Sequence, residues 1–502
     1  MRFNLRYSHI IVLLALFFQG CATISLNQRI ADFQRPAEII RFFEVLDRIV
    51  DEADARNAAS FRVSGFPYLR TNRFLTGLKP DLDTDTRKEQ WIRWLQQLDT
   101  KARKKEIHNL SSGAIRELAR ELGQEADRQI LQDRVADYSE KLLNHDQRQP
   151  EFFSTVQAAV TNPDEYRTAY RVLGLYPITA LPVAFVTHRV QDDFKNWHHT
   201  PVDQLDIQGD LIAYGPSQPA AYSQATAGMI LKRSRKNALG VPIPSVTDGK
   251  ILVGMFAPMI YQDQVQSYDK IGALVWKDGH VRINPQQPTV YYYLTQARFK
   301  GEPVLQLNYA FWYSARDGPN SPWIERGTLD GLTVRISLDN GGLPFMVDIM
   351  NTCGCYHFYV PDQKRVKRII PSPGEVDVFV PRWLPELFPQ NRLNIRMNSG
   401  WHQVVHLGAD HKPSGFLPYR LVAYDQLERL PHSENSYESI FNSRGIAKDS
   451  GRIEFLIFFP MGIPDVGSMR QRGHHAVKLV GRSDFEDPDL FDNNFEFNKY
   501  PN

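Results

Sequence analysis

Two cysteines and three histidines are the residues of this chain whose types and spacing could support chemistry. The stretch FMVDIMNTCGCYHFYVPD places Cys353, Cys355 and His357 at every second position. Alternate residues of a β-strand share one face, so a strand here would hold both thiols and the imidazole together. The stretch SGWHQVVHLG adds His402 and His406, which are four residues apart and share a face of either a strand or a helix.

The first hypothesis for these residues is a metal site. Thiolate and imidazole groups suit zinc or copper, and structural zinc takes four ligands. Cys353, Cys355 and His357 supply three ligands, and His402 or His406 would complete the set. The spacing differs from paired Cys-x-x-Cys knuckles, from the His-Glu-x-x-His protease pattern and from a haem attachment site. Zinc or copper is therefore a candidate cofactor.

Three further hypotheses concern the thiols. A disulfide between Cys353 and Cys355 suits an oxidising compartment, although residues i and i+2 of an extended strand lie ~6.5 to 7 Å apart, at the edge of what a bridge allows. A bend at Gly354 would close that gap. The next hypothesis is a cysteine nucleophile with one of the three histidines as its base. The last is a pair of free thiols that only pack in a core.

The N-terminus carries the features of an export signal. Arg2 and Arg6 precede the apolar run Ile10–Phe18, and QGCA follows that run. A charged start, a short apolar run and a small residue before the cut are typical of a secretory signal. The run is too short for a spanning helix, which needs ~20 apolar residues.

The end of this signal resembles the signal of bacterial lipoproteins. In that family a Gly marks the cleavage point and the next Cys becomes the lipid-bearing first residue, here Gly20 and Cys21. Ala22 follows the cysteine in place of Asp, which in such proteins implies sorting to the outer membrane. The resemblance implies a palmitate-bearing anchor at Cys21, the membrane as a partner, and a body that faces the periplasm. An ordinary secretory signal that ends near a cysteine is the alternative.

Residues 21–165 are expected to form a lipid-anchored helical region. Pro36 suits a first helical turn, and Ser111 or Ser112 can cap a helix that runs to about Leu143. Apolar residues recur at helical spacing on one face of three stretches, and we assign them to the core between packed helices. These residues are Ile39, Phe42, Phe43, Leu46, Ile49, Val50, Trp91, Trp94, Leu95, Leu98, Ile115, Leu118 and Leu122.

Residues 241–502 show the two-residue period of β-structure. The pairs Asp278-Gly279 and Asn340-Gly341 each separate two apolar runs and predict hairpins. Alternating or aromatic runs predict further strands at residues 304–313, 375–381 and 392–398. Period two with turn punctuation favours an antiparallel sheet.

Residues 166–240 are expected to be a linker or docking segment. The apolar stretch Leu173–Val186 is too short to span a bilayer, and Pro177 and Pro182 interrupt it. We expect this stretch to be buried or docked. A stretch that lies on the membrane surface near the lipid anchor is the alternative.

The fold class that follows is α+β: an N-terminal helical region followed by a mainly antiparallel β domain, behind a signal peptide of residues 1–20. The 502 residues suffice for two or more domains. The 59 basic and 57 acidic residues balance so closely that they give no case for nucleic acid as a partner.

The expected function is that of an outer-membrane-anchored envelope lipoprotein that acts as an interaction or scaffold protein, with another envelope protein as a candidate partner. The sequence holds no Walker loop, dinucleotide fingerprint or Gly-x-Ser-x-Gly elbow, and nothing completes a catalytic set around the cysteines. The alternative is a metal-binding or thiol-dependent envelope enzyme centred on Cys353, Cys355 and His357.

Overall fold

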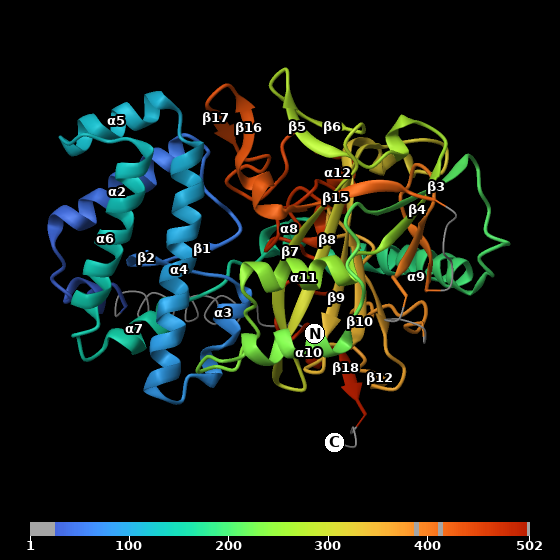
Figure 1. Ribbon diagram of the computed structural model, residues 1–502, viewed down its shortest axis with the longest axis horizontal. Coiled ribbons are helices and arrows are strands. Elements are labelled where there is room, and N and C mark those ends of the chain that lie inside the picture. The colour runs from blue at the N-terminus through green and yellow to red at the C-terminus, as the bar shows by residue number, and fades with distance from the viewer. Residues whose placement is uncertain (1–25, 386–390, 410–414, 499–502) are drawn as a thin grey trace, which may run out of the picture. The chain divides into compact units, whose positions relative to one another are not determined.

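The computed structural model describes residues 26–385, 391–409 and 415–498 (Figure 1). The chain forms two compact units. Among the described residues, unit 1 comprises those up to Asp54 together with Ser60–Pro163, and unit 2 comprises Ala55–Ala59 and those from Asp164 onward. Residues 166–240 therefore fold as part of unit 2.

Unit 1 is a set of helices around one short hairpin. The predicted stripe of the first long helix, α2, is confirmed, because the six residues that make up the stripe are all buried. The elements of unit 1 are α2 (Ala37–Glu52), β1 (Phe61–Val63), β2 (Phe66–Thr71), α3 (Arg73–Gly77), the 3-10 turn η1 (Lys79–Asp81), α4 (Asp85–Asn109), α5 (Ser112–Leu122), α6 (Arg128–Asp146) and α7 (Phe152–Ala159).

The single helix predicted from Ser111 to Leu143 is in fact two helices. Ser111 caps α5 as predicted, since its hydroxyl accepts the Ala114 N–H at 3.1 Å. Gly123 then ends α5 with a left-handed φ of 64°. The Asp127 carboxylate accepts the Ile130 N–H at 2.7 Å and starts α6. A glycine end cap and a new N-cap four residues later outweigh the continuity of the apolar stripe.

A buried ion-pair network ties β2 to α4. Arg70 on β2 contacts Asp99 at 3.1 Å and Glu106 at 2.8 Å, and all three side chains are fully buried. Arg103 on α4 contacts the same Asp99 at 2.9 Å. Loss of one partner from such a network leaves a buried charge uncompensated, at a cost of ~3 to 5 kcal/mol. The network therefore fixes the position of β2 on the helix.

Unit 2 contains helices that the sequence did not predict. The sequence predicted that Pro182 interrupts the apolar stretch, but Pro182 lies inside one continuous helix, α9. The helices of unit 2 are α8 (Thr168–Leu173), α9 (Tyr176–His199), α10 (Gln224–Ser234), α11 (Val246–Phe256), α12 (Phe455–Phe458) and α13 (Leu490–Asn494), with the 3-10 turns η2 (Ser267–Asp269), η3 (Trp323–Glu325), η4 (Tyr424–Arg429) and η5 (Phe459–Met461).

A curled ten-stranded sheet forms the centre of unit 2, in the order β11-β10-β9-β8-β7-β15-β3-β4-β13-β14. Its strands are β3 (Asp210–Pro216), β4 (Met259–Gln264), β7 (Thr289–Phe299), β8 (Glu302–Arg316), β9 (Gly327–Leu338), β10 (Pro344–Asn351), β11 (Phe358–Pro361), β13 (Asn394–Met397), β14 (Val404–Gly408) and β15 (Leu417–Ala423). Shorter strands form three two-stranded sheets: β5 (Ala273–Lys277) with β6 (His280–Asn284), β12 (Val366–Ile369) with β18 (Phe495–Phe497), and β16 (Leu430–Ser433) with β17 (Ser436–Glu438).

The chain thus combines helices and strands, as the α+β class requires, but the large sheet is mixed. Six of its nine neighbouring pairs are antiparallel. The other three are parallel and involve β15 and β13. Strand β15 lies between β7 and β3 and pairs with both of them in parallel. The alternation of apolar and polar residues along a strand does not show whether its neighbours run parallel or antiparallel.

Both predicted hairpins are confirmed. Asp278 and Gly279, with φ of 53° and 74°, join β5 to β6, and the turn at Asn340-Gly341 joins β9 to β10. The prediction of a strand at residues 375–381 is wrong. That segment joins no ladder, and its backbone instead makes single bonds, such as the Tyr359 N–H to the Phe379 carbonyl at 2.8 Å.

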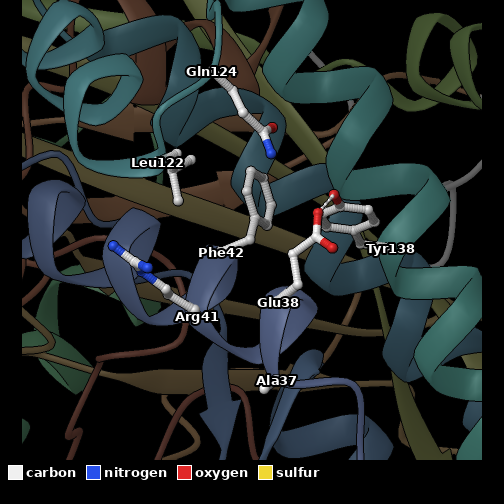
Figure 2. Close-up of a pocket in the computed structure, with 7 residues that line it drawn as sticks. All are labelled: Ala37, Glu38, Arg41, Phe42, Leu122, Gln124 and Tyr138. Atoms are coloured by element: carbon white, nitrogen blue, oxygen red, sulfur yellow. Dashed lines mark hydrogen bonds between the residues drawn. The ribbon is translucent and has the colours of Figure 1, made fainter.

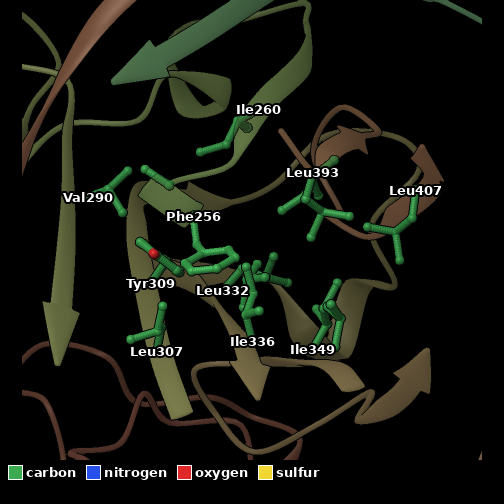
Figure 3. Close-up of a cluster of buried hydrophobic side chains, with 14 of the residues drawn as sticks. Phe256, Ile260, Val290, Leu307, Tyr309, Leu332, Ile336, Ile349, Leu393 and Leu407 are labelled. Carbon is green, nitrogen blue, oxygen red and sulfur yellow. The ribbon is translucent and has the colours of Figure 1, made fainter. Parts of the chain in front are cut away.

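The sheet is buried on both faces. One face packs against α10 and α11 in the large apolar cluster that Figure 3 shows, with Phe256 from α11 beside Tyr309 and Leu332 from the strands. On β8, Phe311 belongs to this cluster, whereas its neighbour Trp312 belongs to a second cluster on the other face. Cys353 lies in that second cluster.

Candidate functional site

Cys353 and Cys355 lie in a turn and not on a strand, so the predicted common strand face with His357 is wrong. Strand β10 ends at Asn351, and the Gly354 N–H then donates to the Asn351 carbonyl at 2.7 Å. Gly354 has a φ of 89°, and a Cβ there would lie 2.4 Å from the Ala476 carbonyl oxygen. Close backbone approach at a glycine therefore reverses the chain where the alternating pattern predicted an extended strand.

The turn brings the two cysteine side chains together. The Cys355 N–H donates to the Cys353 sulfur at 3.4 Å, and the two thiols share a hydrogen bond. Cys353 is buried, Cys355 is half-buried, and both are free thiols. The hydrogen bond with Cys353, together with burial, raises the pKa of Cys355 well above that of a free thiol.

His357 points into a different environment. Its Nε2 lies 3.0 Å from Asp348, whose carboxylate also pairs with Arg335 at 2.6 Å. The imidazole ring contacts Tyr359 and Phe485. Burial lowers the pKa of His357 in spite of the hydrogen bond to Asp348.

His402 is buried between two carboxylates. Its Nδ1 lies 2.8 Å from Asp330 and its Nε2 lies 3.2 Å from Asp269, while its ring stacks on Tyr313 with centroids 3.8 Å apart. Burial opposes a charge on the imidazole, but the two carboxylates hold the pKa of His402 above its usual value. Carboxylates at both ring nitrogens favour the protonated ring of His402, which donates from both nitrogens and has no lone pair with which to deprotonate a cysteine.

The structure does not gather the five candidate ligands into one metal site. His406 lies on β14, 3.2 Å from the Arg382 guanidinium, and His357 and His402 are held by separate carboxylates. No group of three or more His, Cys, Asp or Glu side chains that could hold a metal ion occurs in the described ranges. Of the five residues, the structure joins only Cys353 and Cys355.

Sequence reasoning missed the charged residues that surround the two thiols. Arg316 forms a two-pronged pair with Asp330 at 2.9 and 3.0 Å, and Glu325 accepts from Arg316 at 2.6 Å. Cys353 lies within electrostatic range of both Arg316 and Arg452. The signal available in the sequence was a charged residue inside an otherwise apolar run, such as Asp330 in TLDGLTVRISL.

Glu454 is a further titratable group in this region. It is 5% exposed, and its carboxyl packs against the backbone of Gly467, where a Cβ would lie 2.4 Å away. Burial and the charge of Glu325 raise the pKa of Glu454 to about 7, against the lowering effect of Arg316 and Arg452. We name Arg316, Glu325, Asp330, Cys353, Cys355, His402, Arg452 and Glu454 the thiol cluster.

A second candidate site is an exposed apolar surface on unit 2. Apolar side chains recur at helical spacing on the solvent-facing side of α9. An ordinary surface helix has polar side chains on that side. Helix α8 and α12 add more, and the exposed fractions range from 49% to 75%. The members of this apolar surface are Val172, Leu173, Leu175, Ile178, Leu181, Phe185, Val186, Ile453, Leu456 and Ile457.

The helices that carry the apolar surface pack against one another. Tyr170 on α8 contacts Phe455 and Phe459, with ring centroids 6.1 and 6.4 Å apart. A Cβ at Gly174, between α8 and α9, would lie 2.3 Å from Pro460, so the corner fits closely onto η5. Close packing on the inner side therefore holds these helices together, and each of them exposes apolar side chains.

Basic residues lie next to the apolar stretch. Residues 166–191 contain no Asp or Glu, and Arg167 and Arg189 are exposed on either side of the apolar stretch, while exposed Asp164, Asp192 and Asp193 lie just beyond them. Arg171 lies half-buried beneath it, and its Nε donates to the Met461 carbonyl at 2.9 Å. In the described residues, no helix has the length and apolar character to cross a bilayer.

Unit 1 contains a small open pocket, which Figure 2 shows between α2 and α6. It encloses about 270 Å³ and is lined in part by Glu38, Arg41, Phe42 and Tyr138. The Tyr138 hydroxyl donates to Glu38 at 3.2 Å. One exposed carboxylate, one arginine and a ring give the pocket no set of groups suited to a particular reaction.

Cys21, the predicted lipidation site, lies outside the described residues. Comparisons of the chain with protein-family models, with curated proteins and with solved structures gave no match.

Proposed function

We propose that this chain is a membrane-surface protein of the bacterial envelope, lipid-anchored at Cys21 to the outer membrane and seated on the bilayer by the apolar surface of α8, α9 and α12. In this proposal it acts as an interaction or scaffold protein that presents the rest of its surface to the periplasm. The observation that carries the proposal is the solvent-facing apolar stripe of α9, in which Leu181 and Phe185 are each 72% exposed.

A lipid bilayer fits this surface better than a folded partner does. Contiguous exposed apolar patches are small on most soluble monomers, so this one needs an apolar neighbour. Interfacial helices bury an apolar face ~5 to 10 Å into the headgroup boundary and carry basic residues beside it. Arg167 and Arg189 supply such charges, and no acidic residue lies between them. Anionic headgroups complement that pattern.

Vesicle binding tests the proposal. The chain from Ala22 onward lacks the signal and the lipid, so its sedimentation with vesicles of phosphatidylcholine and phosphatidylglycerol reports on the body alone. We expect the wild-type body to bind, and the variant L181D/F185D to bind about 100-fold more weakly, because each large apolar side chain contributes ~1.5 to 3 kcal/mol when buried.

V246D is the matched control. Val246 begins α11, is 78% exposed and lies outside the apolar surface, so its substitution replaces an exposed apolar side chain with one Asp without touching the proposed contact. Its affinity should stay within about twofold of wild type. If the wild-type body does not bind the vesicles, the membrane proposal fails. If the body instead dimerises in solution and L181D/F185D yields monomers, the apolar surface serves a protein contact and the membrane proposal also fails.

A further inference from the structure

The paired thiols are a second feature that calls for a role, independent of the apolar surface. The Cys355 N–H donates to the Cys353 sulfur at 3.4 Å across a turn whose left-handed φ and close backbone contact at residue 354 require a glycine. A turn shortens the i to i+2 distance below the ~6.5 to 7 Å of an extended strand, into the range that a disulfide spans. The turn is also fixed from outside, since the Arg470 N–H donates to the Thr352 carbonyl at 2.9 Å.

The two sulfurs differ in access. Cys353 is 5% exposed and packs in the apolar cluster with Trp312 and Leu329. Cys355 is half-buried at the edge of the same cluster. An external reagent therefore reaches Cys355 first, and Cys353 is positioned to react only with Cys355.

We propose that Cys353 and Cys355 are a reversible redox pair that is oxidised by exchange with a low-molecular-weight disulfide. The Cys355 thiolate attacks one sulfur of RS–SR, forms Cys355–S–SR and releases RS⁻, which takes up the proton lost by Cys355. Cys353 then attacks the Cys355 sulfur, the bond to SR breaks, and the second RS⁻ leaves with the proton of Cys353. Two thiols become one disulfide, and one RS–SR is reduced to two RSH.

The surroundings of the pair set how it reacts. The thiolate is the attacking species, so the raised pKa of Cys355 makes exchange slow at neutral pH and faster as the pH rises. Besides Cys353, the titratable groups that interact with Cys355 are Glu454 and Glu325.

Mass spectrometry of the full-length protein tests the pair. The reduced protein is incubated with glutathione and glutathione disulfide at a series of ratios, alkylated with iodoacetamide, and digested. We expect the peptide that contains residues 353–355 to become lighter by two hydrogens and resistant to alkylation as the disulfide fraction rises, and to recover when glutathione is added. Cys21 falls in another peptide and does not interfere.

Single variants test the order of attack. C353S should accumulate one glutathione on Cys355, whereas C355S should react about tenfold more slowly or less, because the remaining thiol is buried. A wild-type peptide that stays alkylatable at every ratio, or that carries two glutathiones, would overturn the redox pair. Equal reactivity of C353S and C355S would overturn the assigned order. The wild-type measurement needs no variant to fold.

Discussion

At the scale of single residues, unit 2 contains buried charged groups that contact one another. His402 lies between Asp269 and Asp330, and Arg316 pairs with the same Asp330. Tyr356 and His402 also adopt left-handed φ of 54° and 53°. Such a backbone costs ~1 to 2 kcal/mol per residue, and each ring is anchored by a hydrogen bond to a buried carboxylate that offsets this strain.

Glu454 makes the stability of unit 2 depend on pH. Its folded pKa of about 7 lies above its ordinary value of 4.5, so the folded chain holds the proton more tightly than the unfolded chain. The resulting stabilisation is complete below pH 4.5 and is lost as the pH rises to about 7. Relative to E454Q, which is neutral at every pH, the wild type should lose ~3 kcal/mol of unfolding free energy across this range.

Urea unfolding at half-unit intervals between pH 4.5 and 7.5 measures this difference. E434Q, at an exposed glutamate, is the control and should follow the wild-type curve. Parallel curves for wild type and E454Q would show that the Glu454 carboxyl titrates normally in the folded protein.

At the scale of elements, the helical period located the helices of unit 1 but could not show where they end or which way a stripe faces. Six buried residues on α2 follow the predicted stripe, whereas the equally regular stripe of α9 faces solvent. Periodicity records that one face differs from the other. Whether that face meets a protein core or a membrane is decided by what lies next to it, which no local pattern contains.

Gly123 gives a test of where one helix ends. Because its φ is 64° and nothing lies within 4 Å of a Cβ there, G123A should lose ~1 kcal/mol of stability from backbone conformation alone, with no steric clash. Gly113, inside α5, is the matched control, and G113A should gain ~0.5 to 1 kcal/mol. Urea midpoints compare the two variants. A gain in both would mean that α5 and α6 join into the single helix that the sequence suggested.

At the scale of the whole molecule, the sequence predicted the classes of element and two hairpins but not the order of the sheet. Hairpins depend on adjacent residues, whereas the parallel pairs of β15 with β7 and β3 join strands far apart in the chain. The candidate site divides in the same way. The sequence neighbours Cys353 and Cys355 meet, while His402 binds Asp330 and Asp269, distant residues that its own spacing from His406 could not indicate.

The proposed attachment to the membrane combines two contacts that can be separated genetically. Each CH₂ of a lipid chain at Cys21 contributes ~0.8 kcal/mol of binding free energy when it is buried in the bilayer, and the apolar surface adds an independent contact. In a Gram-negative bacterium that expresses the full chain, C21S should shift part of the protein from the membrane to the soluble fraction, while L181D/F185D alone should stay with the membrane. The triple variant should be fully soluble, because both contacts are then lost.

Cell fractionation with and without a high-salt wash measures these four proteins. The salt wash should release C21S further, since screening weakens the attraction of Arg167 and Arg189 to anionic headgroups. Two outcomes separate the contacts. If C21S is matured and fractionates as the wild type does, the cysteine is not the anchor. If C21S alone is already fully soluble, the apolar surface does not hold the protein to lipid in the cell, and the exposed face of α9 must be covered by another protein.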